Sequence, residues 1–224
     1  MKNSKNNRTV FTLFLIAMAG LMVSVGASAL PNTSGSPSSG LSGEEEYYLV
    51  FMREEEKLAR DSYLVLLDKW GLPIFGNIAE SEQRHMDAVG KLIDKYGLED
   101  PVADESVINH FVDPELQHLF EFLMELGDKS MMDALVVGAM IEETDIIDIQ
   151  HAIDSATHDD IIYIYESLMC GSRNHLRAFV AQIDINGGRY DGEFLESEDF
   201  LAIVNTPVER DCGSLEEIRG ERPR

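Results

Sequence analysis

The chain has 224 residues, of which 44% are hydrophobic and 26% charged, a balance that suits one globular domain with tails. Its 41 acidic and 18 basic residues give a net charge of −23, which argues against nucleic acid and anionic membrane surfaces as partners. Abundant Glu, Leu, Met, Ala and Ile, with few prolines and few hairpin-turn signals, favour an all-α fold.

The N-terminal segment has the pattern of an export signal. Three basic residues precede an apolar run over 10–25, and residues 27–29 read Ala-Ser-Ala, a small-residue cleavage pattern. We therefore expect residues 1–29 to be a signal peptide that directs the chain to the periplasm, the cell surface or the medium. After cleavage the chain has no membrane partner. The alternative is an uncleaved membrane anchor, for which the apolar run is short.

Local signals place the first two helices. Residues 30–43 are rich in Ser, Gly and Pro and are expected to form a disordered linker. A helix is predicted over 42–69, where Ser42 can cap an acidic first turn. A Gly-Leu-Pro break follows, and the second helix is predicted to run to Tyr96, with Gly97 as its stop.

The remaining helices suggest a bundle with one long crossover. After an irregular stretch we predict helices over 114–126, 131–156, 159–185 and 198–204. The four long helices would form a four-helix bundle over residues 44–186, with the short helix at 114–126 inside the crossover. Residues 187–224 would then be a C-terminal extension.

Each long helix carries an apolar stripe at steps of three and four that is interrupted by metal-ligand residue types. In the second helix Glu82 and His85 lie on the stripe. An unpaired buried charge costs several kcal/mol, so both need a partner, and a metal ion is the simplest partner for the two together. The candidate metal ligands over all four helices are Glu56, Glu82, His85, Glu142, Asp145 and His175.

Other acidic and histidine residues are expected to be peripheral. Glu54 and Glu55 lie off the stripe of the first helix, and we expect them to be solvated. Glu115 and His118 repeat the Glu-x-x-His spacing but lie off the apolar stripe of their helix, which indicates solvated surface. The remaining histidines, expected to be peripheral, are His110, His151 and His158.

The candidate ligands match a di-metal carboxylate pattern, in which two helices each give a Glu and two others each give Glu-x-x-His. Two iron or manganese ions carry about four positive charges, which carboxylates neutralise, and one imidazole per ion completes an oxygen–nitrogen set. Three segments resemble ligand motifs of rubrerythrins: Glu56-x-x-Ala59-Arg60-x-x-Tyr63, Ile78-Ala79-x-x-Glu82-x-x-His85, and Glu142-x-x-Asp145, which has Asp in place of a second Glu.

Residues 44–186 as a whole resemble an uncharacterised prokaryotic ferritin-like family, domain of unknown function 2202, most recognisably over 52–61 and 171–179. The resemblance implies a ferritin-like four-helix bundle that binds metal. It supplies no reaction and no catalytic residues. The chain also lacks Cys-x-x-Cys pairs, so the second, rubredoxin-like iron centre of rubrerythrins is absent from it.

The fourth helix departs from the pattern. Ser172 stands where a bridging Glu is expected, three residues before His175. Either Asp145 or a solvent hydroxide fills the place, or the second ion binds weakly or not at all.

Several residues have two readings. Tyr63 and Tyr165 are either neighbours of the metal site or ordinary core residues, and Arg60 and Arg173 either pair with ligand carboxylates or lie on solvated helix faces. Export makes a disulfide available to Cys170 and Cys212, which would tie the C-terminal tail to the fourth helix. Otherwise Cys170 is a buried apolar residue.

The leading functional hypothesis is an exported di-iron, or iron–manganese, protein with redox activity towards a small oxidant, dioxygen or peroxide. The second is a metal storage or buffering protein without turnover. The third is a metal-free structural bundle in which the acidic residues and histidines hydrogen-bond one another. A homo-oligomer is left open, because pattern alone does not identify contacts on the outer helix faces.

Overall fold

The computed structural model describes residues 40–102, 104–210 and 212–213. The predicted signal peptide and most of the predicted linker lie outside these residues, and the predicted domain limits stay predictions. The described residues form six helices and no strands: α2 (Gly43–Trp70), α3 (Pro73–Tyr96), α4 (Pro114–Gly127), α5 (Met131–Ser155), α6 (Asp159–Ile185) and α7 (Ser197–Val204). The all-helical fold is therefore confirmed, and each predicted helix end lies within one residue of the observed one.

Capping residues explain the ends of the first hairpin. The Ser42 side chain accepts a hydrogen bond from the backbone N–H of Glu45, whose carboxylate accepts one from the N–H of Ser42. Helix α2 ends at Gly71, and α3 ends at Gly97; both glycines are left-handed, with φ of 65° and 69°. Only two residues separate α2 from α3, so the two helices run antiparallel as a hairpin.

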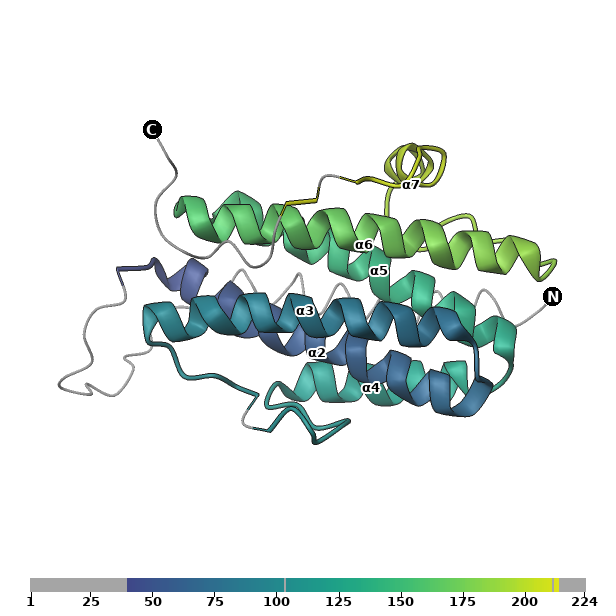
Figure 1. The fold of residues 1–224 in the computed structure, drawn as a ribbon, viewed down its shortest axis with the longest axis horizontal. Helices are drawn as coiled ribbons and strands as arrows, with labels where there is room; N and C mark the ends of the chain where they lie inside the picture. Colours follow the sequence, from purple (N-terminus) through teal and green to yellow (C-terminus); the bar gives the residue numbers. More distant parts are fainter. Residues whose placement is uncertain (1–39, 103, 211, 214–224) are drawn as a thin grey trace. The chain divides into compact units, whose positions relative to one another are not determined.

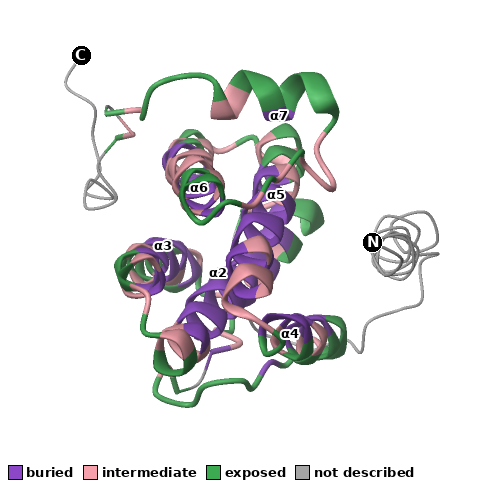
Figure 2. Ribbon diagram, turned by 90° about the vertical axis from the view of Figure 1, so that its right-hand side faces the viewer, coloured by how far each residue is buried: buried purple, intermediate pink, exposed green. Residues whose placement is uncertain are grey.

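The four long helices enclose one common interior. Helix α2 packs along α3, α5 packs along α6, and the two hairpins meet through α2 against α5 and α3 against α6 (Figure 1). Helix α4 lies on α2 and α5, and α7 lies on α6. The buried sides of the long helices face one another (Figure 2), so polar residues on these sides are brought together away from solvent.

Helix α2 is covered on nearly every side, and this overturns one expectation. Every residue from 51 to 63 is buried, and Glu54 and Glu55, expected to be solvated, are only 3% and 6% exposed. The crossover between α3 and α4 folds over this face. The Glu54 carboxylate accepts hydrogen bonds from the backbone N–H groups of Val112 and Asp113 there. Burial of Glu54 is thus offset by backbone donors that helical periodicity does not reveal.

The C-terminal extension is held against the helices at two places. Buried Glu143 on α5 accepts hydrogen bonds from the Tyr190 hydroxyl and from the backbone N–H of Glu193, 2.8 Å away. Further along, Cys170 and Cys212 form the disulfide that the sequence left open. None of the helices in the described part of the chain is long and apolar enough to cross a membrane.

Candidate metal centre

All six predicted ligand residues lie in the interior between the four long helices, and none is more than 9% exposed. They come from every long helix: Glu56 from α2, Glu82 and His85 from α3, Glu142 and Asp145 from α5, and His175 from α6. The helical stripes read from the sequence therefore converge, and five of the six residues form two groups of possible ligands.

The first group is Glu56, Glu82 and His85. The Nδ1 atom of His85 lies 3.1 Å from Oε2 of Glu56 and 2.8 Å from Oε2 of Glu82. All three residues belong to the α2–α3 hairpin, so this group is complete without the second hairpin.

The second group is Glu82, Glu142 and His175, and it joins the two hairpins. The Nδ1 atom of His175 lies 2.8 Å from Oε1 of Glu82 and 3.3 Å from Oε2 of Glu142. Glu82 thus belongs to both groups, and each of its two oxygens faces a different imidazole. The rings of His85 and His175 stack with their centroids 5.7 Å apart.

Several atoms of these groups lack hydrogen bonds. Among the described residues, buried atoms without a hydrogen-bond partner include both carboxylate oxygens of Glu82, Oε1 of Glu56 and Nδ1 of His175. The 2.8 Å contacts around Glu82 are close, but they are not aligned as hydrogen bonds. Each unsatisfied buried group costs about 1–3 kcal/mol. Ligand atoms that share an ion at about 2.1 Å and at right angles lie about 3 Å apart without bonding one another. The donor set therefore fits cations.

The pKa values of the groups indicate a need for positive charge. Burial raises the pKa of Glu56 to about 7, although His85 opposes the shift. Burial alone would lower the pKa of His175, but the facing carboxylates of Glu82 and Glu142 outweigh it and raise the pKa to about 10. Without an ion, protons on these side chains balance the carboxylates, and a bound cation can replace those protons.

Comparisons with known proteins agree with the family read from the sequence. The family model described as "Uncharacterized protein domain (DUF2202)" matches residues 45–207. The chain belongs to the DUF2202 family. It is 49% identical over 177 residues to the uncharacterized protein MJ0754 of Methanocaldococcus jannaschii, a match that covers 79% of this chain and 95% of that protein.

A solved structure is also similar to this DUF2202 chain. The crystal structure of the hypothetical protein MJ0754 from Methanococcus jannaschii aligns with a TM-score of 0.74 and 47% identity, over 81% of this chain and 100% of that one. These proteins are uncharacterised, so they support the fold and the family without naming an activity. The ferritin-like relationship stays a prediction.

Asp145 lies beside the two groups and belongs to neither. It is 4% exposed, and its Oδ2 accepts a hydrogen bond from the hydroxyl of fully buried Ser172. Its Oδ1 has no hydrogen-bond partner in the part of the chain that the structure describes. In this DUF2202 chain Ser172 therefore holds a nearby carboxylate rather than supplying one.

The structure separates Tyr63 from Tyr165, for which the sequence allowed either a place beside the metal site or an ordinary place in the core. The Tyr63 hydroxyl donates a hydrogen bond to Oε1 of Glu142, so Tyr63 contacts a candidate ligand. The hydroxyl of Tyr165 is buried without a partner among the described residues. Neither arginine is seen to pair with a candidate ligand: Arg60 is buried and binds Asp61, and Arg173 binds Glu209.

One residue that sequence reasoning missed is Gly171 on α6. A Cβ atom at this position would lie 2.6 Å from Nε2 of His85, so a larger residue would push the imidazole out of place. A glycine inside a helix costs about 0.5–1 kcal/mol relative to alanine. That cost is the only sequence signal that could have marked the position.

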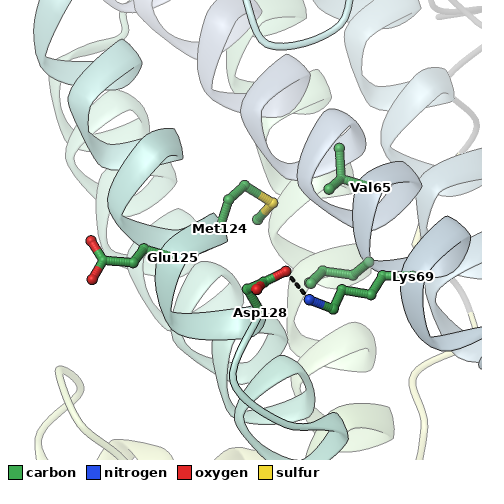
Figure 3. A pocket seen from close by; sticks show the side chains of 6 residues that line it. Val65, Lys69, Met124, Glu125 and Asp128 are labelled. Carbon is green, nitrogen blue, oxygen red and sulfur yellow. Dashed lines mark hydrogen bonds and ion pairs between the residues drawn. The ribbon is translucent and has the colours of Figure 1, made fainter.

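The residues expected to be peripheral lie away from the centre. Glu115, His118, His110 and His151 are exposed, and His158 contacts Glu45 at 2.8 Å near the start of α2. A surface pocket lies between α2 and α4 (Figure 3). It is lined by Val65, Leu66, Lys69, Met124, Glu125 and Asp128, none of which is a candidate ligand.

Proposed function

We propose that this DUF2202 protein is a ferritin-like metal-binding protein with a two-ion carboxylate centre. Glu56 and His85 would hold one ion, Glu142 and His175 the other, and Glu82 would bridge them. The observation that carries the proposal is the placement of Glu82, whose buried oxygens face two different imidazoles without a hydrogen bond to either. Each of the four long helices contributes a ligand, as in the di-metal bundles.

We propose iron or manganese as the bound metals, since this donor set combines oxygen and nitrogen ligands. Carboxylate oxygens combined with imidazole nitrogens are borderline-to-hard ligands, whereas thiolate-preferring ions would find no sulfur in either group. Four buried carboxylates, those of Glu56, Glu82, Glu142 and Asp145, would balance the charge of two divalent ions. This balance supports a pair of ions in a buried centre.

The activity we propose is redox chemistry with dioxygen or peroxide. A bound, reduced iron pair supplies two electrons for reduction of the oxidant. Tyr63 fixes the orientation of Glu142 by its hydrogen bond, and the backbone at Gly171 lets the His85 ring lie against α6. Ser172 contributes no carboxylate, so the centre has fewer protein ligands than the full pattern, which would leave a coordination position for a small oxidant.

Storage or buffering of metal without turnover is the second candidate. The observation that favours it is also Ser172, because a missing bridge weakens the hold on the second ion. A metal-free structural bundle is less well supported, since the 2.8 Å contacts between Glu82 and the two imidazoles are ion pairs that are not aligned as hydrogen bonds.

Metal content per chain tests the proposal. The full chain is purified without chelator and reloaded anaerobically with iron(II), beside the variant Glu82→Ala/His85→Ala. The matched control is Glu115→Ala/His118→Ala, which removes an exposed pair of the same spacing from α4. We expect about two ions in the wild type and the control, and a loss in the first variant. No bound metal in the wild type would overturn the proposal.

The same preparations separate the two candidate functions. Oxidation of added reductant by peroxide or dioxygen that continues beyond one equivalent per centre would establish turnover. A single bound ion and no continued oxidation would favour storage and would indicate that Ser172 costs the second site.

We also infer that the protein is exported. The support is the disulfide between Cys170 and Cys212, since disulfides persist mainly in oxidising compartments outside the cytoplasm. Cell fractionation with N-terminal sequencing of the mature chain tests this, and a cytoplasmic chain with an intact N-terminus would contradict it.

A further inference from the structure

Ligand-type side chains continue along α5 from the centre to the surface. Glu142, Asp145, Asp148 and His151 follow one another at steps of three, which places neighbouring Cβ atoms about 5–6 Å apart. Because three residues fall about 60° short of a full turn, the row winds around the helix. Exposure rises along it, from 1% at Glu142 and 4% at Asp145 to side-chain values of 21% at Asp148 and 56% at His151.

Glu55 on α2 faces this row from the neighbouring helix. Glu55 is only 6% exposed, and its Oε2 atom has no hydrogen-bond partner in the described ranges. Its carboxyl group shares a hydrogen bond with that of Asp148 and lies within electrostatic range of Asp145. On the outer side, Oδ1 of Asp148 lies 3.7 Å from Nδ1 of His151.

This cluster differs from the other buried acids of the same helices. The Glu54 carboxylate accepts hydrogen bonds from two backbone N–H groups, and Asp61 forms ion pairs with Lys57 and Arg60. Glu143 accepts a hydrogen bond from the backbone of the C-terminal extension. Within the described ranges, neither Glu55 nor Asp145 forms an ion pair with a lysine or arginine. Each of the two keeps one carboxylate oxygen without a hydrogen bond. Folding alone gives no reason to bury these two acids so close together.

We propose that Glu55 and Asp148 form an outer divalent-cation site, through which ions pass to Asp145 and then into the buried centre. The inference rests on the proposed function, since it needs a metal centre to supply. Carboxylate oxygens are suitable ligands for a cation that still carries part of its hydration shell, and His151 offers an imidazole at the entrance. Asp145 lies between this site and Glu142 and keeps one oxygen free of hydrogen bonds.

The rate of metal loading tests the outer site. Metal-free full chain is mixed anaerobically with cobalt(II), which replaces iron(II) without oxidation, and loading is followed by stopped-flow absorbance. The variants are Asp148→Asn and Glu55→Gln. The control is Glu115→Gln, which removes one charge from an exposed position on α4. We expect both variants to load about tenfold more slowly than wild type and control, with the same final number of bound ions.

The outcomes separate this inference from the proposed function. Loading at the wild-type rate in both variants would overturn the outer site and leave the centre untouched. Fewer bound ions at saturation would also overturn it, because Glu55 or Asp148 would then belong to the centre itself. A wild-type chain that binds no cobalt(II) would instead overturn the proposed function. Asp148 is half-buried, so Asp148→Asn tests the inference even where Glu55→Gln disturbs folding.

Discussion

The hydroxyl of Tyr63 on α2 donates a hydrogen bond to Oε1 of Glu142 on α5, while Oε2 of the same carboxylate faces Nδ1 of His175 at 3.3 Å. Tyr63 is fully buried, and Glu142 is 1% exposed. One oxygen of Glu142 is therefore held by Tyr63, and the other is directed at His175 of the same ligand group. The orientation of Glu142 depends on a residue that is not itself in either group.

Tyr63→Phe removes this hydrogen bond without changing the size of the ring. We expect the affinity of the ion at Glu142 and His175 to fall about 10–100-fold, because hydrogen bonds that orient ligands contribute on this scale. Metal titration of the variant would then show one tight and one weakened ion. Tyr165→Phe is the matched control, since its buried hydroxyl has no partner in the described part of the chain. Equal titrations for both variants would contradict the prediction.

Gly171→Ala places a methyl group against the His85 ring, 2.6 Å from Nε2 in the present geometry. The imidazole must shift, and with it Nδ1, so we expect the ion at Glu56 and His85 to bind about tenfold or more weakly. Cobalt(II) titration measures the loss. In the control, Gly43→Ala, the new methyl group has no atom within 4 Å, and binding should not change. Wild-type affinity in Gly171→Ala would show that His85 is not a ligand.

Ser172→Glu restores the carboxylate that the di-metal pattern expects. Because position 172 is fully buried next to Asp145, we expect the metal-free variant to lose about 1–3 kcal/mol of unfolding free energy. Bound metal should recover this loss, so the gap in melting temperature between metal-loaded and metal-free protein should widen. Ser167→Glu is the control: Ser167 is buried on α6 at 5% exposure and is not a candidate ligand. A loss of stability that metal does not recover would count against Ser172 as the bridging position.

Acid should weaken the attachment of the C-terminal extension through Glu209. Hydrogen bonds from Arg173, and then from Arg177, lower its pKa from 4.5 to about 2 against partial burial, which raises it. Since the pKa is lower in the folded protein, the stabilising contribution is complete above about pH 4.5 and is lost as the pH falls through about 2. Glu209→Gln should therefore show a smaller loss of stability in this range than wild type. Denaturant unfolding against pH measures the difference, with Glu166→Gln, an exposed α6 acid, as control.

The sequence was sufficient to predict the inner helix faces and the helix ends, because each of these depends on one local physical rule. Apolar residues at steps of three and four identified the inner faces, and on all four of these faces the stripe was interrupted, by Glu56, by Glu82 with His85, by Glu142 and by His175. Capping residues such as Ser42 and Gly97 fixed helix ends because their hydrogen bonds and backbone conformations are local. Local rules of this kind carry over to the folded protein with little change.

The expectation that was wrong, and the alternatives that stayed open, depended on contacts between distant segments. Glu54 and Glu55 were expected in solvent because periodicity assigns one buried face, whereas α2 is covered by other helices and by the crossover. Tyr63 and Tyr165 could not be told apart, since both lie on apolar stripes, and only the facing helix decides which hydroxyl meets a carboxylate. The pairing of Cys170 with Cys212 was left open for the same reason.

The two ligand groups come from different parts of the chain, and this difference sets the order in which their residues are synthesised. Glu56, Glu82 and His85 all belong to the α2–α3 hairpin, whose helices are joined by two residues, whereas the second group needs α5 and α6 as well. The first hairpin leaves the ribosome before the second, so under the proposed function all ligands of the first ion are synthesised before those of the second are complete. Under the proposed function, the ligands of the second ion come together only when the two hairpins dock, so binding of that ion would report completed assembly.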